Sequence, residues 1–308
     1  MTSRYWTWWR CIFLANIIEK ARNLFREEVI IQLEFTTHCN HDCVYCPRYL
    51  IGKTRPLGDI APEMADLLVE RLGTIKDKYN LTLSVSGFGE PDLYPEFIEL
   101  IYRLKAASKA SMRLNTNASL LHRYRHTLII SKHVDHITLS LNLPNEELYR
   151  KYTGQDSYEA VKNNIAAFLR EKGSRKPAAD IRLIKMPDTL PYIDEAREYW
   201  EKHLNKNDRV SVAELANWGG LIGVPKPQMG TCRYLTRQAG KHLTIDMEGH
   251  ASICCFTIAY SHTHPLFVGN IKDHSIDELL RLARIRAGEI DVSMVCKDCD
   301  TRRPVIGV

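Results

Sequence analysis

The chain has 308 residues, of which 44% are hydrophobic and 26% are charged, a composition that supports a buried core and excludes a disordered chain. Its net charge of +5 comes from scattered residues without a long basic run, which argues against nucleic acid as a partner. The nine cysteines form an odd set without a secretory leader, so we expect metal binding rather than disulfides, in the reducing cytoplasm.

Residues 1–28 predict an N-terminal helix ahead of the main domain. Residues 5–18 are apolar and aromatic, but they are too few and too interrupted to span a bilayer. We expect this helix to pack across the bottom of the main domain, with Cys11 buried as a small apolar side chain. The alternative is an interfacial helix that makes peripheral contact with a membrane.

Six apolar, strand-like runs alternate with helical stretches in the main domain. The predicted strands are Val29–Thr36, Leu81–Gly87, Ser111–Asn115, His136–Asn142, Asp180–Lys185 and Arg209–Leu215. Predicted helices between them include Pro62–Tyr79, Pro95–Lys109, Ser157–Lys172 and Tyr192–His203. This order predicts an α/β fold, in which residues 29–218 form a partial (βα)6 TIM-like barrel with right-handed crossovers.

The strands also predict what lies inside the barrel. In the second strand Leu81, Leu83 and Val85 share one face, and small polar residues share the other. The fourth strand repeats this alternation. Because the apolar face must meet the helices, the polar face lines the interior, which favours a ligand cavity over a packed plug of side chains.

The composition changes near Asn217-Trp218-Gly219-Gly220, and we place a domain boundary there, with residues 219–308 as a small C-terminal domain. Leu243–Asp246 and Ala251–Cys254 flank a turn and predict a β-hairpin. Ser275–Ala287 predicts a helix that begins with a capping box between Ser275 and Glu278.

Cys39, Cys43 and Cys46 directly follow the first strand, on a loop at the carboxyl end of the barrel, where such folds keep their active sites. Three thiolates on one short loop can hold three irons of a cubane cluster and leave the fourth iron open. A zinc site would need a fourth ligand, for which His38 and His41 are available, so zinc is the alternative.

This CxxxCxxC motif resembles that of the radical S-adenosylmethionine (SAM) superfamily, and the resemblance covers nearly all of the chain. It implies that a [4Fe–4S] cluster on the three cysteines binds SAM. Reductive cleavage of SAM would then yield methionine and a 5′-deoxyadenosyl radical that abstracts a hydrogen from substrate. The resemblance also implies an electron donor such as flavodoxin or ferredoxin as a partner.

Several further segments match SAM-contacting positions of that family. Gly87-Phe88-Gly89-Glu90-Pro91 resembles the GGEP motif, and Ala118 replaces the glycine of a Thr-Asn-Gly motif. The implied SAM-contacting residues are Tyr45, Gly87, Phe88, Gly89, Glu90, Asn115, Asn117, Ser140 and Asn142. The alternatives are an ordinary β-to-α turn for the glycine loop and simple lining of the cavity for the polar residues.

A second cysteine set lies near the end of the chain. Cys296-Lys297-Asp298-Cys299 is a metal signature, and Cys232 with one of Cys254 and Cys255 completes four thiolates. Four thiolates hold a second [4Fe–4S] cluster or a zinc ion. With the first motif, this set resembles the twitch form of the SPASM branch, which implies an auxiliary cluster on Cys232, Cys254, Cys296 and Cys299.

The resemblance leaves Cys255 without a metal. On an extended strand its side chain would point away from that of Cys254. Radical SAM epimerases use a thiol as hydrogen donor, so the resemblance implies an epimerase of a sugar-like or peptide substrate with Cys255 as a catalytic residue.

Other interpretations stay open. Cys254 and Cys255 can exchange roles, or Cys255 can be a buried apolar side chain. The chain can also be an alcohol dehydrogenase that uses the auxiliary cluster as electron acceptor, a peptide maturase, or a non-catalytic iron–sulfur or zinc protein. Arg48, Lys53 and Arg55 follow the first cysteine loop, and we expect them to be solvated surface charges.

Overall fold

The computed structural model of the chain describes residues 26–223, 232 and 234–299. Residues 1–25 of the predicted N-terminal helix, including Cys11 and residues 5–18, lie outside the described residues, and Glu28, the last residue of the prediction, is the first residue of a strand. Among the residues that are described, no helix has the length and apolar character needed to cross a bilayer.

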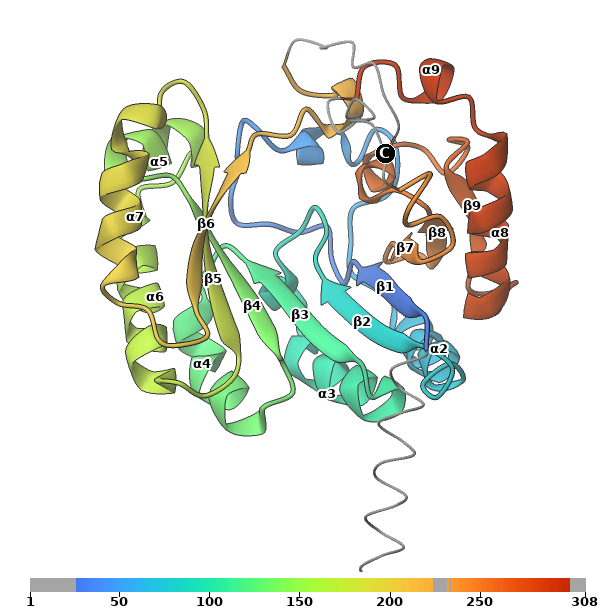
Figure 1. The fold of residues 1–308 in the computed structure, drawn as a ribbon, viewed down its shortest axis with the longest axis horizontal. Helices are drawn as coiled ribbons and strands as arrows, with labels where there is room; N and C mark the ends of the chain where they lie inside the picture. Colours follow the sequence, from blue (N-terminus) through green and yellow to red (C-terminus); the bar gives the residue numbers. More distant parts are fainter. Residues whose placement is uncertain (1–25, 224–231, 233, 300–308) are drawn as a thin grey trace, which may run out of the picture.

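Six parallel strands form the wall of the barrel, and neighbours in the sheet follow the order of the chain (Figure 1). They are β1 (Glu28–Leu33), β2 (Asn80–Val85), β3 (Ser111–Thr116), β4 (His136–Asn142), β5 (Ala178–Lys185) and β6 (Arg209–Glu214). The predicted α/β fold with a partial barrel is therefore confirmed, and each strand lies within a few residues of its predicted position.

Helices cover the outer side of this sheet (Figure 1). They are α2 (Pro62–Gly73), α3 (Phe97–Ser108), α4 (Leu121–Ser131), α5 (Glu146–Thr153), α6 (Tyr158–Lys172) and α7 (Ile193–Glu201). Short 3-10 turns, η1 (Pro47–Leu50), η2 (Pro91–Leu93), η3 (Leu190–Tyr192) and η4 (Trp218–Gly220), lie in the connections. The main hydrophobic core forms where apolar strand residues meet these helices.

The two faces of the strands differ as predicted. Leu81, Leu83 and Val85 of β2 are buried, whereas Thr82 and Ser84, which alternate with them, are only half-buried. A hollow of about 970 Å³ lies along the polar face of β2 to β6. Its lining includes Ser84, Asn115 and Thr138, together with charged side chains near the amino ends of the strands. The polar lining is thus confirmed.

The C-terminal elements continue the barrel sheet. β7 (His242–Ile245) pairs in parallel with β1, and β8 (His250–Ser252) and β9 (Phe267–Asn270) follow in antiparallel pairing. α8 (Ile276–Glu289) and α9 (Val292–Val295) complete this part, which is drawn in orange and red in Figure 1. The capping box of Ser275 and Glu278 is present, as the sequence predicts.

The predicted hairpin exists, but its second strand is shorter than expected. β8 ends at Ser252, and Cys255 begins a 3-10 turn, η5 (Cys255–Ala259). Of these two cysteines, only Cys254 has an extended backbone, with φ −131° and ψ 131°. The expectation that Cys254 and Cys255 sit on one strand and point in opposite directions is therefore wrong.

Candidate active site

The first cysteine loop leaves β1 and lies against the end of α5. The backbone N–H of Asp42 donates to the Thr153 carbonyl at 3.2 Å, and that of Val44 donates to the Tyr152 carbonyl at 3.0 Å. The Cys46 N–H donates to the Cys43 carbonyl at 3.0 Å, which closes a tight turn within the motif. These backbone contacts fix the loop without using the cysteine side chains.

The three sulfurs of this loop interact with one another. Burial raises the pKa of Cys39, Cys43 and Cys46 to about 11 each. The negative charge of a neighbouring thiolate raises each pKa further: Cys43 acts on Cys39, Cys46 acts on Cys43, and Cys39 acts on Cys46. Thiolates in this position need a metal centre to displace their protons, and three adjoining thiolates fit three irons of a [4Fe–4S] cluster.

His41 has a structural environment. It is buried, its ring meets that of Tyr149 edge-on, and its Nε2 lies 3.3 Å from the Tyr149 hydroxyl. Burial lowers the pKa of His41 to about 4, so the ring is neutral at physiological pH. The tyrosine contact occupies one of the two ring nitrogens through which His41 could bind zinc.

The Gly87-Phe88-Gly89-Glu90-Pro91 loop packs directly on the cysteine loop. A Cβ atom at Gly87 would lie 2.5 Å from Glu34 Cγ, and one at Gly89 would lie 2.2 Å from the Thr36 carbonyl oxygen. The Glu90 N–H donates to the His38 carbonyl at 2.7 Å. Only glycine allows this approach, so both glycines are required by the geometry and not merely by a turn.

Glu90 links this loop to the end of β3. Its carboxylate is buried, and Oε2 accepts from the backbone N–H of Asn117 at 2.8 Å. The Asn117 amide in turn donates to Asn40 Oδ1, also at 2.8 Å. Within the described residues, Glu90 Oε1 is buried without a hydrogen-bond partner. A buried acceptor of this kind is costly unless a donor outside the described residues satisfies it.

The remaining predicted SAM residues divide between two places. The Asn142 amide donates to the Tyr45 hydroxyl at 3.2 Å, so these two lie together beside the cysteine loop. Asn115 instead lines the 970 Å³ hollow, and Ser140 is half-buried on the same polar face of the sheet. Ala118 has a φ of +63°, the left-handed conformation that glycine favours, so the turn keeps a glycine-like backbone.

The second cysteine set also gathers in space. Burial raises the pKa of Tyr260 to about 12, with further contributions from the charges of Cys299, Cys254 and Cys296. The charge of Cys232 acts on Cys254. Four sulfurs therefore surround one region, which fits four-thiolate coordination of an auxiliary cluster.

Cys255 lies next to this set. A hydrogen bond with Cys255, together with burial, raises the pKa of Cys254 well above its usual value, so the two thiols adjoin. The Cys255 sulfur also lies 3.4 Å from the Tyr234 hydroxyl. Its side chain is half-buried, which leaves it partly accessible.

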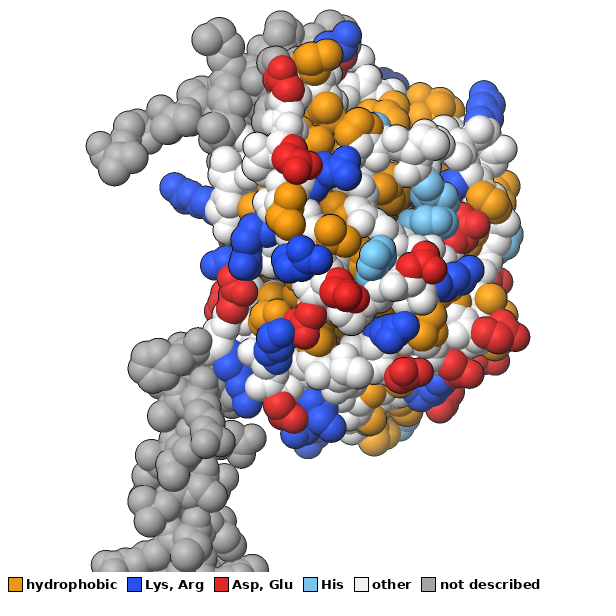
Figure 2. Space-filling model, turned by 90° about the vertical axis from the view of Figure 1, so that its right-hand side faces the viewer, with side chains coloured by type: hydrophobic (Ala, Val, Ile, Leu, Met, Phe, Trp, Pro, Cys, Tyr) orange, Lys and Arg blue, Asp and Glu red, His pale blue; other side chains and the backbone are white. Residues whose placement is uncertain are grey.

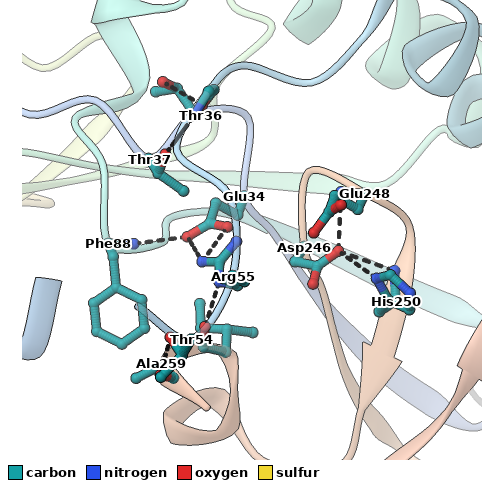
Figure 3. Close-up of polar contacts among 12 residues, drawn as sticks. Glu34, Thr36, Thr37, Thr54, Arg55, Phe88, Asp246, Glu248, His250 and Ala259 are labelled. Atoms are coloured by element: carbon teal, nitrogen blue, oxygen red, sulfur yellow. Dashed lines mark hydrogen bonds and ion pairs between the residues drawn. The ribbon is translucent and has the colours of Figure 1, made fainter. Parts of the chain in front are cut away.

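Sequence reasoning missed an ion pair beneath the glycine loop. Arg55, expected at the surface, is buried, and its Nη2 lies 2.6 Å from Glu34 Oε2 (Figure 3). Glu34 Oε1 accepts from the Phe88 N–H at 3.0 Å, and Arg55 Nε donates to the Ile258 carbonyl at 2.6 Å. Burial raises the pKa of Glu34, and the Arg55 charge opposes that rise.

These contacts attach the η5 segment to the glycine loop. Thr54 donates through its hydroxyl to the Ala259 carbonyl at 2.9 Å, beside the Arg55 contact (Figure 3). The Trp218 ring lies between Phe88 and Phe256, with centroid distances of 5.2 and 5.0 Å. The segment that begins with Cys255 is therefore held against the loop that the sequence assigns to SAM. No single sequence signal indicates these contacts, because their partners are up to 205 residues apart.

Two protein-family models match this chain. A family model of the radical SAM superfamily matches residues 33–188, about half of the chain. The chain belongs to the radical SAM superfamily. A second model, an iron–sulfur cluster-binding domain named SPASM, matches residues 232–300. This radical SAM enzyme therefore uses [4Fe–4S] clusters and SAM as cofactors.

Curated relatives of this radical SAM protein cover only part of it. A probable GTP 3′,8-cyclase of Methanothermobacter thermautotrophicus is 29% identical over 143 residues, which is 46% of this chain and 44% of the relative. One of Methanococcus maripaludis is 31% identical over 144 residues, which is 46% of this chain and 45% of the relative. The chain spans about half the length of the curated relatives it matches.

Solved structures share the fold over most of the chain. BtrN in complex with AdoMet and 2-DOIA has a TM-score of 0.57 at 16% identity, covering 89% of this chain and 94% of its own. Native anSMEcpe with bound AdoMet has a TM-score of 0.62 at 16% identity, with 89% and 91% covered. Streptococcus suis SuiB bound to S-adenosylmethionine has a TM-score of 0.64 at 16% identity, with 84% and 67% covered.

Proposed function

We propose that this radical SAM enzyme is an epimerase of a sugar-like or peptide substrate, in which Cys255 returns a hydrogen atom to a substrate carbon radical. The observation that carries the proposal is the position of Cys255. It adjoins Cys254, one of the four cysteines of the second set, and begins a segment that Arg55 and Trp218 hold against the Gly87–Pro91 loop.

The same proposal assigns the cofactor contacts. Cys39, Cys43 and Cys46 hold the SAM-binding cluster, and Cys232, Cys254, Cys296 and Cys299 hold the auxiliary cluster. Tyr45, Gly87, Phe88, Gly89, Glu90, Asn115, Asn117, Ser140 and Asn142 contact SAM. The adjoining thiols, the close approach at both glycines and the unpaired Glu90 oxygen in the described part of the chain support this assignment.

With the cluster loaded and one electron supplied, bound SAM would provide the 5′-deoxyadenosyl radical that removes a hydrogen atom from a substrate carbon, giving methionine and 5′-deoxyadenosine. Cys255 then breaks its weaker S–H bond and delivers the hydrogen atom of its own thiol to the opposite face of the substrate carbon. The thiyl radical returns to a thiol by taking up one electron and a solvent proton.

The reaction needs two one-electron deliveries in each turnover. We propose a ferredoxin or flavodoxin as the donor and the cytoplasm, where such donors work, as the compartment. The Tyr234 hydroxyl, 3.4 Å from the Cys255 sulfur, orients the thiol between turnovers.

The names of the curated relatives make cyclisation of GTP the competing proposal for this chain. The two proposals predict different fates of the substrate radical. An epimerase returns a hydrogen that exchanges with solvent, whereas a cyclase forms a new bond within the nucleotide. In an alcohol dehydrogenase, the substrate radical would instead lose a proton and a second electron and become a ketone.

The test is incubation of the holoenzyme with SAM, a reductant and candidate sugars, peptides or GTP in deuterated buffer. The epimerase proposal predicts one solvent deuterium in an inverted product. The Cys255→Ala variant should still form 5′-deoxyadenosine but incorporate no deuterium. Unchanged deuterium in that variant, a ketone product, or a cyclic product from GTP would each overturn the proposal.

Cluster content provides the control. Cys254→Ala should lose the iron of the auxiliary cluster, whereas Cys255→Ala should keep both clusters. If Cys255→Ala loses the auxiliary cluster and Cys254→Ala keeps it, Cys255 is a metal ligand and the proposed donor role is wrong.

A further inference from the structure

Four side chains meet around the β7–β8 hairpin, apart from both cysteine sets. Asp246, Glu248 and His250 come from the hairpin turn, and His262 comes from the loop after η5. One ligand atom of each lies within 4.8 Å of the other three. Figure 3 shows Asp246, Glu248 and His250 turned toward one another. Figure 2 shows histidine side chains beside acidic ones on the face that carries the C-terminal elements.

The spacing of these atoms matches a small coordination sphere. His262 Nε2 lies 2.8 Å from Asp246 Oδ2 and 3.7 Å from Glu248 Oε2. His250 Nδ1 lies 3.6 Å from Asp246 Oδ1. In a tetrahedral zinc site with bonds of about 2.1 Å, neighbouring ligand atoms are about 3.4 Å apart. The observed distances bracket that value.

Two atoms of the group take part only in long ion pairs within the described residues. His250 Nδ1 and Glu248 Oε2 are buried atoms without a hydrogen-bond partner there. Such atoms are costly unless something else satisfies them.

We propose that Asp246, Glu248, His250 and His262 form a site for one divalent transition-metal ion, and that zinc fits this set best. Two imidazoles and two carboxylates are a donor set that zinc accepts. The two carboxylates balance the charge of the ion. The side chains of Glu248, His250 and His262 are between a quarter and a third exposed, which gives the ion a path from solvent.

A metal ion at this site would hold in place the segment between His250 and His262, which contains Cys254 and Cys255. His250 precedes Cys254 and Cys255 in the chain, and His262 follows them. An ion shared by these histidines ties together both ends of the segment that carries the two thiols. This role is structural, and it does not depend on which reaction the enzyme catalyses.

The experiment uses the holoprotein with both iron–sulfur clusters loaded, so that the cysteines of those clusters are occupied. After treatment with a chelator and addition of one equivalent of Zn²⁺, gel filtration should retain about one zinc per chain. Zinc-edge X-ray absorption should show nitrogen and oxygen neighbours near 2.0–2.1 Å and no sulfur near 2.3 Å. A sulfur shell would overturn the proposal.

Variants locate the ion. Glu248→Gln and His262→Asn should each weaken zinc binding about tenfold or more, whereas His264→Ala, a neighbouring histidine packed on Tyr260, should bind like wild type. Glu248 Oε2 has no hydrogen-bond partner among the described residues, so Glu248→Gln should fold even if His262→Asn does not. Zinc binding that is unchanged in Glu248→Gln and in every folded histidine variant would refute the site.

Discussion

Arg55→Met tests the buried ion pair with Glu34. Both side chains are completely buried, and Arg55 also bonds the Ile258 carbonyl. Removing one partner of a buried pair costs about 3–5 kcal/mol, because the other charge stays buried and unpaired. That cost is a large share of a typical unfolding free energy of about 5–15 kcal/mol. Arg55→Met should therefore be severely destabilised.

The assay is anaerobic urea unfolding of the holoprotein, followed by circular dichroism. Arg103→Met is the matched control, because Arg103 pairs with Asp66 at the surface, and such pairs contribute about 0.2–1 kcal/mol. The double variant Glu34→Gln/Arg55→Met should lose less than Arg55→Met alone, since no buried charge remains and the introduced amide oxygen can still accept from the Phe88 N–H. If Arg55→Met costs no more than Arg103→Met, the reasoning is refuted.

The same variant has a predictable pH dependence. The pKa of Glu34 is raised in the folded protein, and loss of Arg55 should raise it further. A carboxyl whose pKa is higher in the folded state holds a proton that the unfolded state releases as pH rises. The stability deficit of Arg55→Met should therefore be larger at pH 8 than at pH 5.5. A deficit that is constant over this range would mean that loss of Arg55 does not change the protonation state of Glu34, which would contradict the prediction.

Two substitutions test the backbone of the SAM loops. Gly89→Ala would place a Cβ 2.2 Å from the Thr36 carbonyl oxygen, so the rate of 5′-deoxyadenosine formation should fall about a hundredfold. The control is Gly288→Ala, at an open helical position, which should leave that rate unchanged. Equal rates in the two variants would contradict the packing argument. Ala118→Gly should leave the free energy of unfolding in urea unchanged or raise it by about 1 kcal/mol, because glycine adopts the left-handed conformation without strain. The control, Ala106→Gly in α3, should lower the free energy of unfolding by about 1 kcal/mol. An equal loss at both positions would show that the φ of +63° at Ala118 carries no strain.

Local patterns predicted the strands, the polar lining and the capping box of Ser275, because each depends on residues that are close in sequence. Alternation along Leu81–Val85 identifies the buried face wherever the strand pairs. The spacing of Cys39, Cys43 and Cys46 likewise brings three thiols onto one loop. These features needed no knowledge of distant partners.

Non-local contacts produced the errors. The surface expectation for Arg55 failed because its partners, Glu34 and Ile258, come from distant segments. The orientation of Cys255 was wrong because β8 ends at Ser252, where its pairing with β7 and β9 stops. The group around Asp246 escaped notice for a similar reason, since His262 is brought back to the hairpin by a turn that the sequence does not mark.

The parallel pairing of β7 with β1 has a consequence for protein engineering. Residues Ile30–Leu33 are hydrogen-bonded on one side to β2 and on the other to β7. The C-terminal part therefore supplies one of the two neighbouring strands of β1, which leads into the cysteine loop. A chain truncated after residue 218 would leave β1 as an unprotected edge, a known template for aggregation. A chimera that exchanges the C-terminal part between relatives must therefore transplant a strand that matches this edge, and not only a set of cysteines.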